Sequence, residues 1–299
     1  ITEIKMENGS VFKGKMFIDA SYEGDLMAAA GVSYTSGRDP QDLYDEKGAG
    51  IDEGRNQGIS PYVVPDDPSS GVIPYVIDSM PDDWQGPDGG DHLLQAYNFR
   101  MHLTKRENKV PYPRPDGYDP ADFEFMYRIM ASGSNVRLSL GADTNNHEVI
   151  GHNAGTDYVN GNWIVREGKV VNWAEASYEE REQMFQAHVK YQQGYMYYIA
   201  HNLLPRAEAD PELKGDEKKE WAMEQIRKLV TAVNAYGLNP GEFDETGHWP
   251  WALYVREARR MVADEVMTEH NVFGREVAKD PVGLANYWAD SHRVRRYSK

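Results

Sequence analysis

The stretch Phe17-Ile18-Asp19-Ala20-Ser21-Tyr22-Glu23-Gly24-Asp25, followed by Leu26 to Gly31, decides how the rest of the sequence is interpreted. The apolar run that ends at Ile18 predicts a strand entering a buried sheet. A tight loop follows, and Gly24 to Ala30 predict a short Ala-rich helix that stops at Gly31. A helix N-terminus beside a strand end gathers free N–H groups that can hold a phosphate, although an ordinary strand-to-helix connection has the same spacing.

The residues before this stretch predict a β-hairpin. Ile1 to Met6 and Val11 to Ala20 are joined by Glu7-Asn8-Gly9-Ser10, and an Asn-Gly pair readily adopts the positive φ angles of a tight turn. Residue 1 is Ile rather than Met, and nothing near it has the pattern of a signal peptide. We therefore expect the chain to begin inside a longer protein, and its compartment is not predicted.

Composition excludes several classes of function. The 299 residues include 32 Lys and Arg against 48 Asp and Glu, a formal net charge of −16, which disfavours binding to nucleic acid or to an anionic membrane. No apolar run is long enough to cross a membrane. Because Cys is absent, disulfides, thiolate metal sites, iron–sulfur clusters and Cys nucleophiles are excluded.

The remainder predicts a mixed α+β fold. From Ser36 to Gly90 the chain is rich in Gly, Pro and Asp, which predicts a long irregular insertion or lid rather than helix. His92 to Leu103 alternate partly like a strand. Three helices are expected: from Asp119-Pro120 to about Ala131, from the capping box at Ser177 to about Leu204, and from about Asp216 to Tyr236. Tyr191, Tyr195, Tyr197 and Tyr198 are interpreted as helix packing.

The stretch from Phe17 to Asp25, with Leu26 to Gly31, resembles the second flavin-binding motif of FAD-dependent oxidoreductases of the glutathione-reductase-like superfamily. The closer resemblance is to a bacterial FAD-dependent oxidoreductase family, some of whose members are labelled xanthan lyases. Further blocks resemble that family in the same order over essentially the whole chain: Pro61 to Pro65, Gln95 to Arg100, Asp143 to Asn146, Gly247 to Pro250, Tyr254 to Met261 and Asp290 to His292.

The resemblance implies FAD as cofactor and a two-domain enzyme of which this chain is an interior part. Residues 1–35 would be a remnant of the FAD-binding domain, 36–284 the substrate domain, and 285–299 the start of the return to the FAD domain. The family's N-terminal Gly-x-Gly-x-x-Gly loop is not found here, because the nearest pattern, Gly48-Ala49-Gly50 with Gly54, lies in a polar stretch and follows no convincing strand. The C-terminal segment that closes over the flavin is missing as well. We therefore expect residues 1–299 alone to bind FAD weakly or not at all and to be inactive.

The resemblance places the cofactor contacts in the loop after the first apolar run: Asp19, Ala20, Ser21, Tyr22, Glu23, Gly24 and Asp25. Ser21 stands where the family usually has Thr, which keeps the hydroxyl. Asp19 is a candidate for a polar contact near the cofactor, and an Asp before a tight turn is equally often a simple cap.

Two constellations are candidates for catalysis. His248, followed by Arg256 and Arg259, could orient a carboxylated or hydroxylated substrate or stabilise negative charge on a reduced flavin, unless these Arg residues only pair with neighbouring carboxylates. His292, two residues after Asp290, could serve as a base as hydride leaves the substrate. The alternative is that it is an ordinary surface residue without a catalytic role.

Tyr97, Asn145 and Asn146 are expected to line the substrate pocket. The polar stretch from Asp143 to His147, together with His152 and Asp157, could also supply ligands for a divalent metal. Neutral Asn side chains without a fixed His spacing favour a polar loop instead, and we predict no metal site.

The predicted function is hydride transfer between flavin and an unidentified small or sugar-like substrate. Two alternatives remain open at this stage: a polysaccharide lyase or hydrolase, which an acidic, aromatic-rich surface also suits, and a non-catalytic binding fragment. The substrate, the electron acceptor and the oligomeric state are not predicted by the sequence.

Overall fold

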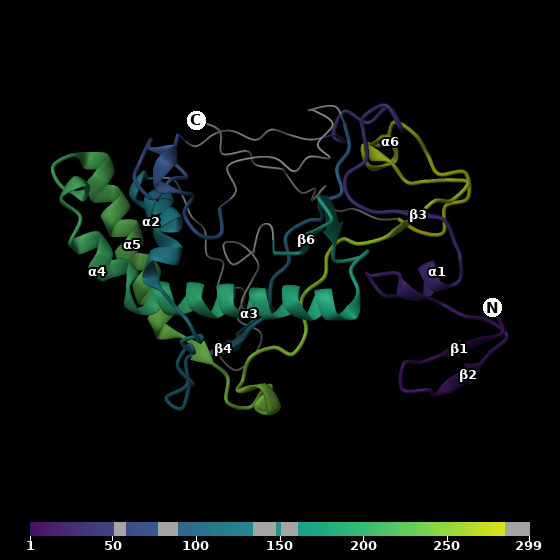
Figure 1. Ribbon diagram of the computed structural model, residues 1–299, viewed down its shortest axis with the longest axis horizontal. Coiled ribbons are helices and arrows are strands. Elements are labelled where there is room, and N and C mark those ends of the chain that lie inside the picture. The colour runs from purple at the N-terminus through teal and green to yellow at the C-terminus, as the bar shows by residue number, and fades with distance from the viewer. Residues whose placement is uncertain (51–57, 77–88, 134–147, 151–160, 285–299) are drawn as a thin grey trace.

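A computed structural model describes residues 1–50, 58–76, 89–133, 148–150 and 161–284. The chain contains both helices and short strands, in agreement with the mixed α and β content expected (Figure 1). The elements are β1 (Glu3–Lys5), β2 (Val11–Lys13), α1 (Asp25–Ala29), β3 (Tyr34–Thr35), β4 (His102–Thr104), α2 (Glu124–Ala131), β5 (Glu148–Ile150), β6 (Trp163–Arg166), β7 (Lys169–Asn172), α3 (Tyr178–His201), α4 (Leu203–Glu208), α5 (Glu217–Ala235), β8 (Gly237–Leu238), β9 (Arg260–Met261) and α6 (Glu269–Val272).

Helix α3 runs through the middle of the molecule, with α2, α4 and α5 at one end and α1 with the β1–β2 hairpin at the other (Figure 1). Its start is fixed by the predicted capping box, in which Ser177 and Glu180 each bond the other's backbone N–H, at 3.3 and 2.7 Å. The helix ends three residues earlier than expected. Pro205 does not terminate the helical region, because it lies in the first turn of α4, where a missing N–H costs nothing.

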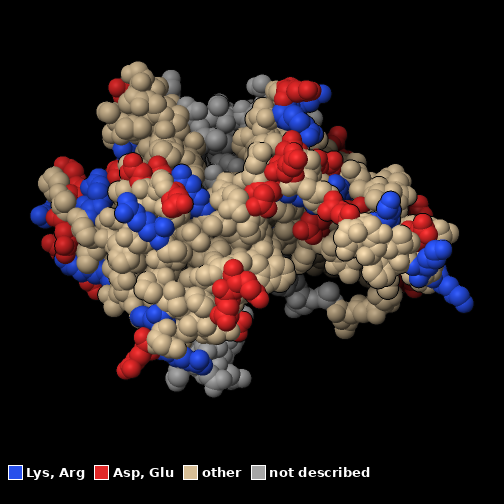
Figure 2. Space-filling view, turned by 60° about the horizontal axis from the view of Figure 1, so that its bottom comes forward, with Lys and Arg blue, Asp and Glu red and all other residues tan. Residues whose placement is uncertain are grey.

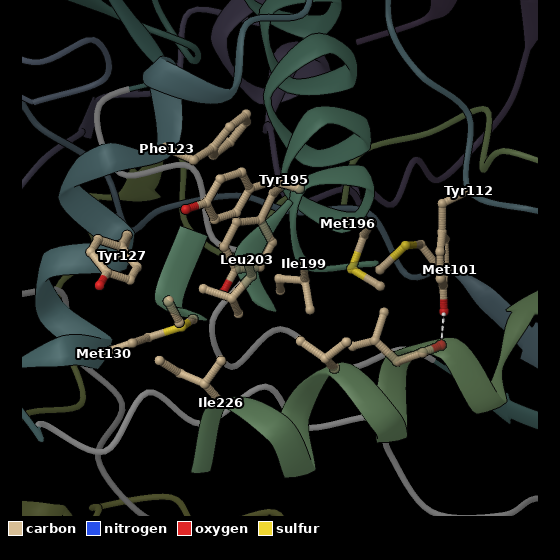
Figure 3. Packing of buried hydrophobic residues seen from close by; sticks show 14 of the residues in the cluster. Met101, Tyr112, Phe123, Tyr127, Met130, Tyr195, Met196, Ile199, Leu203 and Ile226 are labelled. Atoms are coloured by element: carbon tan, nitrogen blue, oxygen red, sulfur yellow. Dashed lines mark hydrogen bonds between the residues drawn. The ribbon is translucent and has the colours of Figure 1, made fainter. Parts of the chain in front are cut away.

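The main core lies between α2, α3 and α5 (Figure 3). Tyr195, Met196 and Ile199 of α3 are completely buried there, and Phe123 stacks on Tyr198 with ring centroids 5.4 Å apart. The hydroxyl of Tyr112 donates to the carbonyl of Val233 at 3.3 Å. The Tyr-rich face of α3 is therefore packing, as predicted, and α5 begins and ends within a residue of the expected limits.

A second, smaller core lies toward the opposite end of α3. It contains Leu94 and Tyr97 from the segment before β4, Trp173 and Ala174 after β7, and Ala258 before β9. Tyr97, Phe99, Met101 and Leu103 are buried, but Leu94, Gln95 and Asn98 are buried as well, so the predicted alternation holds only in part, and within this segment only His102–Thr104 form a strand.

The sheets are small and antiparallel. Among the described residues the largest sheet has three strands in the order β5-β4-β8, and β6 pairs with β7. The pair β3–β9, with Tyr34 opposite Met261 and Thr35 opposite Arg260, joins two segments more than 200 residues apart in sequence. This pair sets the segment before β9 beside the loop that precedes α1.

The N-terminal hairpin is confirmed, with Glu3 opposite Lys13 and Gly9 at φ 84° in its turn. The prediction that its second strand continues to Ala20 and enters a buried sheet is wrong, because that strand ends at Lys13. Met16 and Ile18 are 85% and 86% exposed and belong to no strand, because no sheet among the described residues continues alongside them. The described parts of 36–90 are irregular apart from one 3₁₀ turn, Pro68–Ser70, as expected. The division at residues 35 and 284 stays a prediction.

Candidate functional site

The loop between the hairpin and α1 is organised by its own side chains. The carboxylate of Asp19 accepts hydrogen bonds from the backbone N–H and the hydroxyl of Ser21, at 3.1 and 2.7 Å, and from the N–H of Met27 inside α1, at 2.9 Å. The Ser21 oxygen in turn accepts from the N–H of Gly24 at 3.1 Å. These bonds, above all the one from the Ser21 hydroxyl, hold the pKa of Asp19 below its usual range.

Asp19 therefore acts as a cap for α1 in this structure. Its carboxylate accepts a hydrogen bond from the N–H of Met27, one of the N–H groups at the start of the helix that could otherwise bind a phosphate. Fewer N–H groups are therefore free to bind an anion than the sequence pattern predicts. Whether Asp19 also contacts a cofactor stays a prediction.

Gly24 begins α1 in the left-handed region at φ 65°. A Cβ there would lie 2.9 Å from Cε of Met27 and 3.4 Å from Cβ of Arg259. The residue must therefore be small and tolerate a positive φ, which only Gly does without strain.

Asp25 is held by two arginines from distant parts of the chain. Arg181 of α3 binds it in a bidentate pair at 2.7 and 2.8 Å, and Nη1 of Arg259 approaches it at 2.6 Å. The same Arg259 nitrogen donates to the carbonyl of Glu23 at 2.9 Å, and its other terminal nitrogen donates to the carbonyl of Ala174. The hydrogen bonds from Arg181 are the main reason that the pKa of Asp25 is lowered.

We call Asp25, Arg181 and Arg259 the arginine clamp. Both arginine side chains are about nine-tenths buried, at 11% and 9% exposure, whereas the Asp25 side chain is 41% exposed. The clamp thus ties the exposed loop to the second core through one carboxylate. Arg259, expected to orient substrate or flavin, is committed to this contact in the structure.

Beside the clamp, the loop presents an exposed apolar edge. Met16, Ile18 and Tyr22 are 85%, 86% and 55% exposed. Ala20 and Ser21 between them are exposed as well, whereas Glu23 is half-buried and Gly24 buried. A loop that is fixed by hydrogen bonds and shows apolar side chains to solvent can hold a flat aromatic ligand by contact with its face or rim.

The other predicted site residues do not all gather here. The Nδ1 atom of His248 lies 3.0 Å from the carbonyl oxygen of Glu242 and 3.4 Å from a carboxylate oxygen of Asp244. The short 3₁₀ helix before it, Asp244–Thr246, lies below α3 in Figure 1, apart from α1 at the right. The structure therefore does not bring His248 to the loop.

Tyr97 is fully buried rather than at the wall of a pocket. Its hydroxyl donates to the carbonyl of Glu257 at 2.5 Å, and its ring lies edge-on to Trp173 and stacked with His188. Arg256 is half-buried in the segment next to Glu257. His292, Asn145 and Asn146 lie outside the described residues, so their predicted roles stay predictions.

Arg181 is the member of the clamp that sequence reasoning missed. A usable signal was present: Arg181 shares the helical spacing of Met184, His188 and Gln192, which are all buried. A charged residue on the buried stripe of a helix needs a partner, and Asp25 is that partner.

Acidic side chains collect over the middle of the face in Figure 2, whereas the end formed by α4 and α5 mixes both signs. Within the described ranges, no group of three or more His, Asp or Glu residues is placed to hold a metal ion. No helix in the described part of the chain is long and apolar enough to cross a membrane.

A family model described as FAD dependent oxidoreductase matches residues 1–299. No curated protein and no solved structure matches the sequence.

Proposed function

The chain belongs to the FAD-dependent oxidoreductase family, and from this premise we propose that it takes part in hydride transfer between the flavin of FAD and a carbon atom of a small or sugar-like substrate. When bound, FAD supplies the redox chemistry, and the protein supplies position, charge and exclusion of water.

The residues present fit one edge of the cofactor. The exposed apolar edge at Met16, Ile18 and Tyr22 suits contact with a flat ring system, and the loop next to it is fixed by Asp19 and the arginine clamp. They do not supply a phosphate-binding loop, since the sequence contains no Gly-x-Gly-x-x-Gly. The proposal therefore assigns the loop to the flavin side of FAD and leaves the pyrophosphate to residues beyond 1–299.

The observation that carries the proposal is this pairing of rigidity with exposure. Exposing apolar side chains to water is unfavourable, and exposed loops are normally mobile. Here two arginines whose side chains are nine-tenths buried hold the loop in one position. Such an arrangement is expected where a ligand must be met by a preformed surface.

For the chemistry we propose His292 as the base that takes a proton from the substrate as hydride leaves, because imidazole titrates near neutral pH. Arg256, Asn145 and Asn146 are proposed as substrate contacts. We call the loop between the hairpin and α1, residues 14–24, the cofactor loop. We assign Arg259 to holding this loop through Asp25 rather than to touching the substrate, and His248 and Tyr97 to packing and polar structure.

The test is spectroscopic. The product of the complete open reading frame that encodes this chain should carry a flavin band near ~450 nm that bleaches on reduction. Residues 1–299 alone, titrated with FAD, should quench flavin fluorescence weakly or not at all. A complete product that holds no flavin but cleaves a polysaccharide would contradict the proposal and favour a lyase or hydrolase.

A further inference from the structure

We propose that Arg100 forms a carboxylate-binding site one aromatic ring away from the cofactor loop, and that the substrate is a carboxylic acid. The anion site stands on the geometry alone, whereas the assignment of the anion to the substrate rests on the function proposed above.

Arg100 is placed by the segment that leads into β4. Phe99 and Met101 on either side of it are buried in the core, so Arg100 points to the opposite face and is half-buried. The N–H of Tyr254 donates to the carbonyl of Asn98 at 2.8 Å, which lays the segment around Tyr254 alongside.

The guanidinium of Arg100 lies over the ring of Tyr254, with Cζ 3.8 Å from the ring centroid. Tyr254 in turn meets Tyr22 of the cofactor loop edge-on, with ring centroids 6.4 Å apart. Tyr254 therefore contacts both the positive charge of Arg100 and Tyr22 of the exposed apolar edge.

The guanidinium of Arg100 lacks part of its polar contacts within the described residues. Among the described residues no carboxylate pairs with it, in a chain that has 48 Asp and Glu against 32 Lys and Arg. Its Nε is buried and has no hydrogen-bond partner. A buried N–H left without an acceptor is destabilising, and the contact with Tyr254 satisfies the charge but not the N–H.

A carboxylate is the ligand that matches this arrangement. The planar guanidinium fork binds two carboxylate oxygens in parallel, and one oxygen could accept from Nε. A single arginine balances a single negative charge, whereas a phosphate dianion would bring excess charge to a protein of net charge −16. The aromatic rings of Tyr254 and Tyr22 offer an apolar surface for the body of the same ligand.

The experiment compares acids with their neutral counterparts on the apo chain. Tyrosine and tryptophan fluorescence of residues 1–299 is titrated with glucuronate against glucose, and with benzoate against benzyl alcohol. We expect the acid to bind at least about tenfold more tightly than its neutral counterpart in one pair or both, from the charge-assisted contact.

Arg100→Gln should abolish this preference. Arg114→Gln is the matched control, because Arg114 also lies over a tyrosine, with its Cζ 5.4 Å from the ring centroid of Tyr118. Unlike Arg100, Arg114 is exposed and does not contact Tyr254. The control should bind as the unmodified protein does. If Arg100→Gln proves unfolded by circular dichroism, Arg100→Lys replaces it and should retain only part of the preference.

Three results would overturn the proposal: no preference for the acid in either pair, a preference that survives Arg100→Gln, or a tighter, Arg100-dependent response to inorganic phosphate than to either acid. The last would assign the arginine to the cofactor's phosphates. Since no FAD is present, a carboxylate preference lost in Arg100→Gln would uphold the anion site even if the complete product carried no flavin, and that combination would overturn only its assignment to a redox substrate.

Discussion

The two ends of helix α3 are stabilised in different ways. At one end, α2, α3 and α5 enclose a core of fully buried aromatic and aliphatic side chains. At the other, residues 14–25 expose apolar side chains to solvent and are held through side-chain hydrogen bonds and the arginine clamp. The first arrangement resists unfolding, and the second keeps a surface in place while leaving it open to a ligand.

The largest contrast should come from the same substitution made in both regions. Ile199→Ala removes a fully buried side chain and should lower the free energy of unfolding by about 3 kcal/mol, from lost burial and the cavity left behind. Ile18→Ala, at a residue 86% exposed, should change it by no more than about 0.5 kcal/mol. Urea denaturation of both variants measures the difference, and equal losses would mean that residue 18 is buried in solution.

The pH dependence of the two regions should differ as well. His188 in α3 is completely buried, and burial lowers its pKa from 6.5 to about 4, with its Nδ1 2.7 Å from the carbonyl of Met184. Because the folded-state pKa is lowered, the neutral, buried His188 contributes its full stabilisation above pH 6.5. This contribution to the free energy of unfolding is lost as the pH falls toward 4. The shift corresponds to about 3 kcal/mol at most.

Thermal melts of the wild type between pH 7 and 4 should show this loss, and His188→Gln should flatten the slope. His201→Gln, at an exposed residue of the same helix, is the control and should leave the slope unchanged. An unaltered slope in His188→Gln would show that another group carries the acid sensitivity.

The clamp should act locally rather than globally. Asp25→Asn leaves two nine-tenths buried arginines without their carboxylate. The free energy of local opening of residues 15–31 should fall by about 1 to 3 kcal/mol, and their amides should therefore exchange faster. In the wild type the same release should begin only below pH 3.8, since the pKa of Asp25 is lowered and its stabilisation is lost as the pH falls through the folded-state value.

Hydrogen exchange followed by mass spectrometry measures the release of this segment. Asp42→Asn, at an exposed position, should leave its exchange unchanged. Normal protection of 15–31 in Asp25→Asn would show that the clamp does not hold the loop.

Much of this architecture was predictable because it rests on local rules. The Asn-Gly hairpin, the capping box at Ser177 and the stripe of α5 follow from spacing and side-chain chemistry within one segment. The clamp was not predictable, because Asp25, Arg181 and Arg259 are brought together by the β3–β9 pairing and the packing of α3.

The prediction that failed has the same origin. Met16 to Ile18 are apolar, as in a buried strand, but burial needs a neighbour, and no described segment provides one. Likewise Tyr97 was expected to line the substrate pocket, and only the tertiary contacts with Trp173 and His188 reveal it as core.

A smaller loss of local protection than that in Asp25→Asn is predicted at Gly24. Gly24→Ala places a Cβ at φ 65° and 2.9 Å from the flexible end of Met27, and should weaken local protection of the loop by about 1 to 2 kcal/mol. Gly9→Ala, also at positive φ but with nothing within 4 Å, should disturb only the hairpin turn. If Gly9→Ala loosened the 19–25 loop equally, the loop would depend on the hairpin rather than on its own geometry.

The central claim is that the exposed apolar edge of residues 16–25 meets FAD. Hydrogen exchange of the complete open reading frame product, with and without FAD, tests it directly. The account predicts that FAD slows exchange at residues 16–25 while the α3–α5 core stays unchanged. Bound FAD that protects other segments and leaves 16–25 as open as before would contradict it.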